Sequence, residues 1–207
     1  KQGKQSCKDS IDKNNMLTMG ISNVDIYTGR TSISQFDVEY FHNPCTYDEL
    51  ERYITVYKPS ECIFVSNLEP ELINDVYQYI GIDDIKIHNV YSGDKEEYRE
   101  NTGIQKYSIN AEKQIYQLKL FNQFYPNNED LFHSSYAEHY IAIQSLTLLL
   151  DFIYQHSPHL INKLNIPIFD NYTNRLILAN HSLKQLNILD DSRHRGKLKS
   201  VSSLLNN

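Results

Sequence analysis

The stretch from Asn23 to Ser34, NVDIYTGRTSIS, predicts two short strands joined by a tight turn. β-branched and aromatic residues occupy both halves of it, as they do in strands. Gly29 lies in the turn, where glycine adopts a positive φ at little cost. We expect strands over Met16–Tyr27 and Thr31–Phe36. Asp25 falls inside the first strand, where it is either a metal ligand of a nuclease sheet or an ordinary polar residue.

Beyond this hairpin the pattern alternates between helix and strand. Thr46 and Glu49 have the spacing of a capping box, which begins a helix, and Pro59 ends that helix. We expect helices at 46–57 and 69–80 and strands at 61–65 and 85–90. A hairpin followed by β-α-β units predicts an α/β fold, in which helices flank a mixed sheet.

The rest of the chain reads as mostly helical. Asn110 reads as the cap of a helix that runs to about Phe121. Apolar residues at helical spacing predict a long buried helix from Tyr136 to Ile153. After Pro167 we expect a short apolar strand at 175–178 and helices that begin at Asn180 and Val201. The last helix cannot bury its leucines within this sequence, so we expect the sequence to be a fragment of a longer protein.

Composition limits the classes of function. The formal net charge of −6 at pH 7 argues against a surface built mainly to bind phosphates. Three widely spaced cysteines indicate a reducing compartment. No apolar stretch approaches the length of a membrane span, and no signal peptide opens the sequence. We therefore expect an intracellular, soluble protein without membrane partners; nucleus, cytoplasm, organelle and virus are not distinguished.

Common catalytic motifs are absent from the sequence. It contains no phosphate-binding glycine loop, no dinucleotide fingerprint and no G-x-S-x-G elbow. His133 and His139 are six residues apart, which does not place two metal ligands on one helical face. Cys45 and Cys62 read as small buried groups rather than nucleophiles. These patterns favour no enzyme class and no bound cofactor.

The nuclease hypothesis depends on acids that converge. A two-metal nuclease needs several carboxylates around ions that lie roughly 4 Å apart. The partners that the sequence offers to Asp25 are Glu61 before the next apolar strand and Glu69 or Glu71 after it. Nothing in the sequence brings them together. A structural role for Asp25 is therefore favoured, and the nuclease remains the alternative.

Four segments, taken in order, resemble the MutS family of DNA mismatch-repair proteins. The first two are MGISNVDIYTGRTSISQF (19–36) and YDELERYITVYKPSECIFVSN (47–67), and they resemble its connector domain. The third and fourth are NRLILANHSLKQLNILDD (174–191) and GKLKSVSSLLNN (196–207), and they resemble the start of its helical core or lever domain. Parts of the sequence are similar to the giant-virus and octocoral-mitochondrial branch of the family.

The resemblance implies a fold and a division into domains. Residues 1–15 would be a linker from an upstream domain, 16–157 an RNase H-like connector, and 158–207 the beginning of an all-α lever or core region. The connector would couple mismatch binding to nucleotide state. The family's mismatch-wedging motif and its phosphate loop are absent here, so the resemblance implies no catalysis and no cofactor in this chain; ATP and Mg²⁺ belong to the whole protein.

The resemblance also implies partners. These are other MutS domains, a second MutS subunit, mismatched DNA held mainly by other domains, and a MutL-type protein. The expected helix at 110–121 resembles part of the surface that docks the MutL-type partner, and its exposed candidates are Lys113, Gln114 and Gln117. Two other functions stay open: an RNase H-like metal-dependent nuclease that uses Asp25, and a generic protein-interaction module.

Overall fold

The computed structural model describes residues 16–40, 44–82, 85–94, 98–99, 103–126, 138–170, 186–188 and 200–205. Strands β1 (Met16–Val24) and β2 (Thr31–Glu39) form the expected antiparallel hairpin, with Met16 opposite Glu39 and Val24 opposite Thr31. The hairpin prediction is confirmed. The placement of Asp25 inside the strand is wrong, because β1 ends one residue earlier.

A β-α-β unit follows the hairpin, as predicted. Helix α1 (Asp48–Tyr57) leads to β3 (Glu61–Ser66), and helix α2 (Pro70–Ile80) leads to β4 (Lys86–Tyr91), which pairs in parallel with β3. Gly81 ends α2 with φ 70°. The predicted helix start is displaced: a 3-10 turn, η1 (Pro44–Tyr47), precedes α1, whose N-cap is Tyr47 rather than Thr46.

The expected single mixed sheet is found as two small sheets in the described part of the chain. One has the order β1-β2-β5, where β5 (Ile168–Phe169) runs parallel to β2, and the other pairs β3 with β4. Side chains join the sheets, since Leu17 of β1, Phe64 of β3 and Ile87 of β4 pack against one hydrophobic cluster. The protein is thus a mixed α/β structure in which small sheets are flanked by helices.

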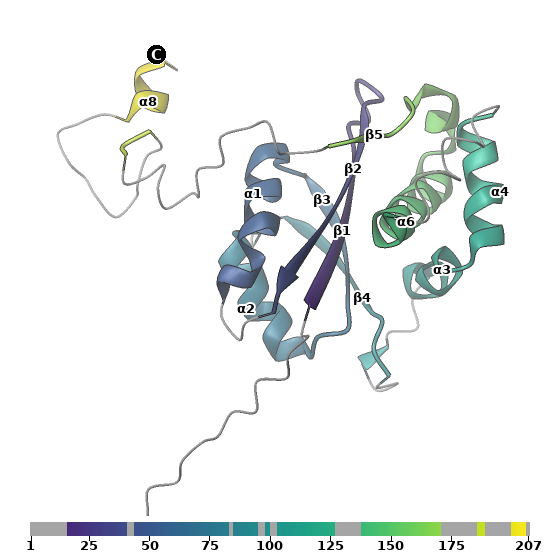
Figure 1. The fold of residues 1–207 in the computed structure, drawn as a ribbon. Helices are drawn as coiled ribbons and strands as arrows, with labels where there is room; N and C mark the ends of the chain where they lie inside the picture. The colour runs from purple at the N-terminus through teal and green to yellow at the C-terminus, as the bar shows by residue number, and fades with distance from the viewer. Residues whose placement is uncertain are drawn as a thin grey trace, which may run out of the picture.

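Helices lie on both sides of the strands (Figure 1). Helices α1 and α2 cover one side. The other side carries α3 (Gly103–Ala111), α4 (Gln114–Phe124), α6 (Tyr140–His156) and the 3-10 helix η3 (Pro158–Lys163). The predicted helix start at Asn110 is wrong, because that residue lies within α3 and the break falls at residues 112–113. Tyr136 lies outside the described residues.

Helix α6 packs closely on the hairpin. A Cβ added at Gly20 of β1 would lie 2.4 Å from the backbone carbon of Ile141, so only glycine allows this approach. The side chain of Gln35, from β2, accepts hydrogen bonds from the amides of Ile141 (3.0 Å) and Ala142 (3.2 Å). A side chain from the sheet therefore caps the helix N-terminus, which normally needs a local capping residue.

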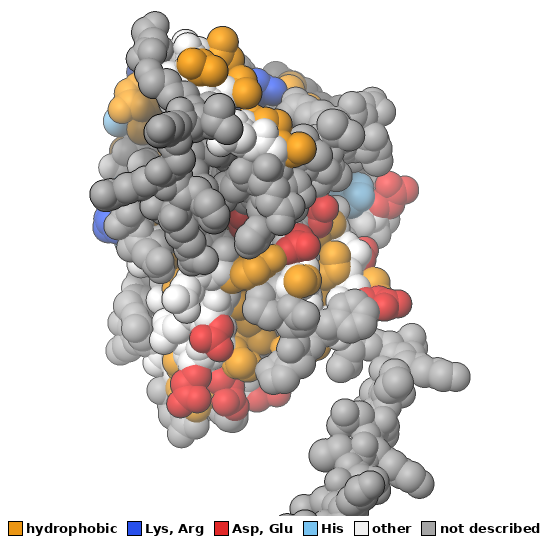
Figure 2. Space-filling view, turned by 90° about the vertical axis from the view of Figure 1, so that its left-hand side faces the viewer, with side chains coloured by type: hydrophobic (Ala, Val, Ile, Leu, Met, Phe, Trp, Pro, Cys, Tyr) orange, Lys and Arg blue, Asp and Glu red, His pale blue; other side chains and the backbone are white. Residues whose placement is uncertain are grey.

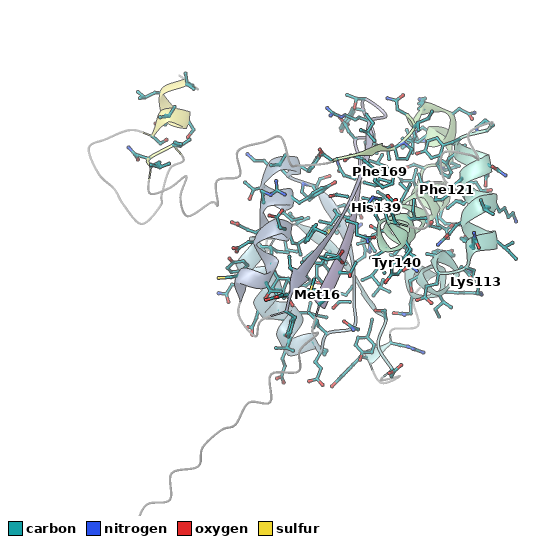
Figure 3. The ribbon with its side chains drawn as sticks, in the orientation of Figure 1. Met16, Lys113, Phe121, His139, Tyr140 and Phe169 are labelled. Atoms are coloured by element: carbon teal, nitrogen blue, oxygen red, sulfur yellow. The ribbon has the colours of Figure 1, made fainter. Side chains whose placement is uncertain are left out.

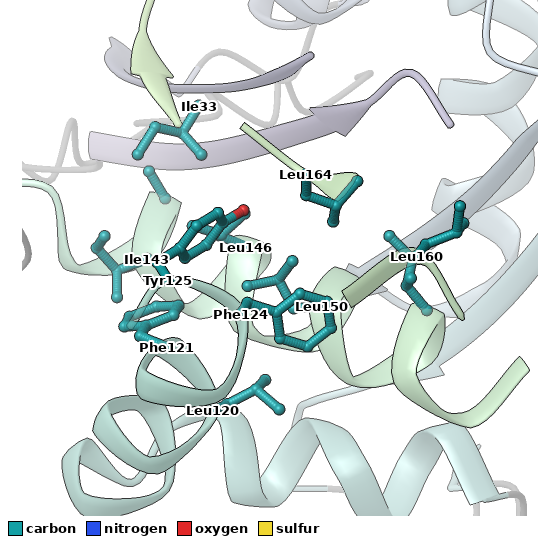
Figure 4. Packing of buried hydrophobic residues seen from close by; sticks show 12 residues of the cluster. Ile33, Leu120, Phe121, Phe124, Tyr125, Ile143, Leu146, Leu150, Leu160 and Leu164 are labelled. Carbon is teal, nitrogen blue, oxygen red and sulfur yellow. The ribbon is translucent and has the colours of Figure 1, made fainter. Parts of the chain in front are cut away.

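The main hydrophobic core lies between α4, α6, η3 and β2 (Figure 4). Its fully buried members include Ile143, Leu146 and Leu150, each with 0% of its surface exposed. The prediction that the long helix, α6, is buried is confirmed, because apolar residues lie on several of its faces. The other buried members are Ile33, Leu120, Phe121, Phe124, Tyr125, Ala142, Ile153, Leu160 and Leu164.

The C-terminal region is described only in part. Helix α8 (Val201–Leu205) confirms the helix predicted to begin there. Residues 186–188 form a turn with Asn187 at φ 55°, so the helix predicted from Asn180 does not continue through them. The apolar run at 175–178 lies outside the described residues. Among the helices that the structure describes, none is long and apolar enough to cross a membrane.

Candidate functional site

Asp25 holds the hairpin turn together. Its carboxylate accepts hydrogen bonds from the Thr28 hydroxyl (2.7 Å) and from the amides of Tyr27 (3.0 Å) and Thr28 (3.4 Å). Its own amide donates to the carbonyl of Arg30 at 2.9 Å. The Thr28 hydroxyl, and then the Tyr27 amide, hold the pKa of the Asp25 carboxyl below its ordinary value of 3.8. This arrangement is an Asx-type turn, in which the acid replaces backbone hydrogen bonds.

The other acids of the nuclease hypothesis have different surroundings. Glu61 accepts hydrogen bonds from Lys86 Nζ (2.6 Å) and His88 Nε2 (2.7 Å), and the His88 bond, followed by the Lys86 bond, lowers its pKa. Glu69 is the N-cap residue of α2 and Glu71 lies in its first turn. Across the described ranges, no three His, Cys, Asp or Glu residues are grouped so that they could hold a metal ion. The structure therefore gives Asp25 no ion site in that part of the chain.

The histidine and cysteine candidates are scattered. His139 precedes α6 and packs its ring against Phe169, 4.9 Å between centroids (Figure 3), while His133 lies outside the described residues. Cys62 is half-buried, and burial raises its pKa to about 11, so it is a poor nucleophile. Cys45 is exposed, which corrects the expectation that it is buried.

The three partner-binding candidates lie where α3 passes into α4. Lys113 is the N-cap residue of α4; its amide donates to the Asn110 carbonyl at 3.0 Å and its ammonium to the Asn110 side chain at 3.1 Å. Gln114 begins α4 and is exposed. Gln117 is only 5% exposed, and its Nε2 donates to the carbonyl of Ala111 at 2.6 Å. The expectation that Gln117 is exposed is wrong, because its amide joins the two helices.

A partly buried polar contact joins α4 to α6. The Tyr116 hydroxyl donates to Asp151 Oδ2 at 2.6 Å, and Asp151 is 1% exposed within α6. Burial, followed by this hydrogen bond, raises the pKa of Tyr116. Leu120 and Phe121, on the inner face of the same helix, enter the main core. The outer face of α4 is therefore presented on a firmly held helix.

Sequence reasoning missed the most exposed apolar residue of this helix. Ile115 is 85% exposed and lies beside Lys113 and Gln114, with Lys119 one turn further on, also exposed. We call these four residues the α4 surface, and Figure 3 places Lys113 at the outer edge of the helical layer. The sequence contains one signal for the exposure of Ile115, its position outside the apolar stripe of the helix.

Acidic residues gather on the opposite side of the protein. The first turn of α1 carries Asp48, Glu49 and Glu51. Figure 2 faces that side and shows acidic side chains around exposed hydrophobic ones. Lysines of α3 and α4 are thus separated from the acids of α1 by the strands and α6.

Comparison with known proteins gives one relevant match. No protein-family model matches the sequence. The chain is 27% identical over 208 aligned residues to a protein of Acanthamoeba polyphaga mimivirus, whose provisional name describes it as a DNA mismatch repair protein and a MutS homolog. The alignment covers 93% of this chain and 18% of the viral protein, so the chain spans less than a fifth of that relative's length. The match supports a distant relationship between this chain and the MutS family.

Proposed function

We propose that this chain is the connector region of a MutS-like mismatch-recognition ATPase. In this function the α/β body transmits changes between mismatch binding and nucleotide state, and the α4 surface docks a MutL-type partner. The observation that carries the proposal is the match to the viral MutS homolog along nearly the whole chain. The resemblance of four ordered segments, from 19–36 to 196–207, agrees with it.

The way α4 is held supports a docking role. A surface that binds a partner costs less free energy to immobilise when it is already rigid. The partly buried Tyr116–Asp151 contact and the core residues of α4 fix the helix, while Lys113, Gln114 and Ile115 face outward. An exposed isoleucine beside charged and polar residues has the composition of a small interface centre with a polar rim.

The domain organisation belongs to the same proposal. Residues 1–15 would link the body to an upstream domain, and the helical core or lever would follow the body. We place that boundary after Asp170 rather than at residue 157, because β5 pairs with β2 and η3 packs into the main core. An RNase H-like relationship is supported by the hairpin followed by a parallel β-α-β unit, although the backbone pairing forms two sheets.

Catalysis and cofactors are assigned to other domains of the longer protein. There, ATP with Mg²⁺ would bind, a second MutS subunit would assemble, and mismatched DNA would be held. In this chain Asp25 is engaged in its turn and Glu61 is paired with Lys86 and His88. We therefore propose a mechanical rather than a catalytic role for the α/β body.

Binding of a MutL-type protein from the same genome tests the proposal. Lys113→Glu should weaken binding to the 207-residue chain about tenfold, the effect of an interface residue worth roughly 1.4 kcal/mol. The matched control is Lys58→Glu, the same charge change at an exposed residue after α1 on the other side of the strands. Unchanged affinity for Lys113→Glu, or equal losses for the two variants, would reject the α4 surface.

The nuclease alternative is tested on the same preparations. The chain is incubated with branched and RNA–DNA hybrid substrates in the presence of Mg²⁺ or Mn²⁺. We expect no cleavage above that of a control without protein. Cleavage that disappears in Asp25→Asn would replace our proposal with the nuclease.

A further inference from the structure

A short segment crosses the edge of β2 where the chain leaves the α/β body. We call residues 165–170 the strap, which contains β5. Its pairing with β2 joins Ile168 to Ser32 and Phe169 to Ile33. In Figure 1 the strap passes from η3 across β2 toward α1. A strand with two paired residues has few backbone hydrogen bonds to lose, so it separates from its sheet more easily than β1, which pairs along nine residues.

The strap buries little of its own surface. Ile166 is 43% exposed and Ile168 is 58% exposed, so neither side chain holds the strap firmly on the body. Phe169 is half-buried; it packs against the main core, and its ring contacts that of His139 (Figure 3). A side chain that is buried only in part gains only part of the free energy of a core residue. The middle of the strap is therefore weakly attached.

Hydrogen bonds hold the strap at its two ends. At the first end the amide of Asn165 donates to the carbonyl of Gly29 at 2.8 Å, next to Leu164, which is buried in the main core. At the second end the amide of Asp170 donates to the carbonyl of Ile33 at 2.9 Å. Attachment at both ends of an exposed middle is the arrangement expected of a segment that opens as one unit.

The second end also contacts α1. The Tyr57 hydroxyl donates to Asp170 Oδ2, and the Ser34 hydroxyl donates to the Asp170 carbonyl at 3.5 Å. Ser32 Oγ, from a residue that is 4% exposed, donates in turn to the Tyr57 hydroxyl at 3.4 Å. A hydrogen bond to a carboxylate is roughly twice as strong as one between neutral groups. The bond between Tyr57 and Asp170 therefore outweighs each neutral hydrogen bond that holds the strap.

We propose that the strap opens as a unit while the rest of the body stays folded, and that the Tyr57–Asp170 hydrogen bond is the latch that keeps it closed. Opening would release residues 165–170 and lengthen the chain that follows them by up to about 20 Å. It would also uncover the edge of β2 at Ser32 and Ile33. The strap is then an adjustable connection between the α/β body and the region after it, whether or not the MutS assignment holds.

Native-state hydrogen exchange, followed by nuclear magnetic resonance, tests this device in the 207-residue chain. The reporters are the amides of Asn165 and Asp170, at the two ends of the strap, and the core amide of Tyr125, which donates to Phe121 at 2.7 Å. Each rate is compared with that of an unstructured amide to give a protection factor. We expect equal protection factors at Asn165 and Asp170, both lower than that of Tyr125, because opening of the strap requires less than global unfolding.

Tyr57→Phe removes the latch hydroxyl, and Tyr79→Phe is the matched control. Tyr79 also donates its hydroxyl to a carboxylate, that of Asp48, but this bond joins α2 to α1 and remains when the strap opens. Tyr57→Phe should lower the protection factors of both strap amides about tenfold, as expected for the loss of a hydrogen bond to a charged group. Tyr79→Phe should leave both unchanged. Circular dichroism checks that each variant is folded.

Three results would overturn the proposal. Protection factors at the strap amides equal to that of Tyr125 in the unaltered chain would show that the strap opens only with the whole body. A fall at Asp170 alone in Tyr57→Phe would show fraying of one end instead of opening as a unit. No fall at either strap amide, or the same fall in Tyr79→Phe, would show that the bond between Tyr57 and Asp170 is not the latch.

Discussion

Replacing Gly29 by alanine should destabilise the protein much more than the same change at Gly81. Both glycines have a positive φ, 73° and 70°, where a Cβ costs about 1–2 kcal/mol. The surroundings differ. A Cβ at Gly81 meets nothing within 4 Å, whereas a Cβ at Gly29 would lie 2.1 Å from the carbonyl oxygen of Lys163. The pair thus separates backbone strain from the contact between the hairpin turn and η3.

The magnitude follows from what must move. The carbonyl oxygen of Lys163 has to retreat from 2.1 Å to at least 3.4 Å to restore ordinary contact, and overpacking of this kind costs about 1–3 kcal/mol. The same movement strains the hydrogen bond from Asn165 to Gly29, 2.8 Å long, which contributes about 1 kcal/mol. We expect Gly81→Ala to cost about 1–2 kcal/mol and Gly29→Ala about 3–6 kcal/mol.

Urea denaturation followed by far-UV circular dichroism measures both free energies of unfolding. The denaturant slope should stay the same for the two variants, so that the midpoints compare directly. Effects of mutations at independent sites add within about 0.5 kcal/mol. If the two variants lose the same free energy of unfolding within that margin, the close contact between the turn and η3 is refuted.

Three further predictions use the same assay. Gln35→Ala removes the acceptor for two α6 amides and should lower the free energy of unfolding by about 1–2 kcal/mol. Gln78→Ala, at an exposed residue, should leave it unchanged. Equal effects of the two variants would contradict the capping of α6 by Gln35. Tyr116→Phe leaves the buried Asp151 with one hydrogen-bond donor fewer and should lower the free energy of unfolding by about 1–3 kcal/mol. Tyr154→Phe, at a more exposed tyrosine, should lower it little. An unchanged stability in Tyr116→Phe would show that this hydrogen bond does not hold α4. The pKa of Asp25 is lowered in the folded state, so its stabilisation is complete above the ordinary value of 3.8 and is lost as the pH falls through the lowered value. The difference in urea midpoint between pH 7 and pH 3 should therefore be smaller in Asp25→Asn than in the unaltered chain or in Asp75→Asn, and an equal difference would contradict the turn.

Local signals in the sequence identified the elements but not their assembly. Gly29, Pro59 and Gly81 marked a turn and two helix ends correctly, because each acts through its own backbone. Thr46 did not mark the start of α1, since a 3-10 turn precedes that helix and its N-cap is Tyr47. The two-residue strand β5 was missed because its pairing with Ser32 and Ile33 depends on residues far away in sequence.

The candidate site was predicted in position but not in detail. The helix with Lys113 and Gln114 was found, yet helical spacing alone did not show that Gln117 turns inward to the carbonyl of Ala111. Gln35 reads as a polar strand residue, and nothing local indicates that it caps α6. Such side-chain roles are fixed by tertiary contacts, which a single sequence does not reveal.

The most direct test of the central claim uses the longer MutS-like protein that we propose. Lys113→Glu should leave mismatch binding and ATP hydrolysis unchanged, while recruitment of the MutL-type partner falls about tenfold. Lys58→Glu in the same protein serves as the control and should change none of the three. Loss of mismatch binding or of ATP hydrolysis, with recruitment of the partner intact, would contradict a connector that docks its partner through the α4 surface.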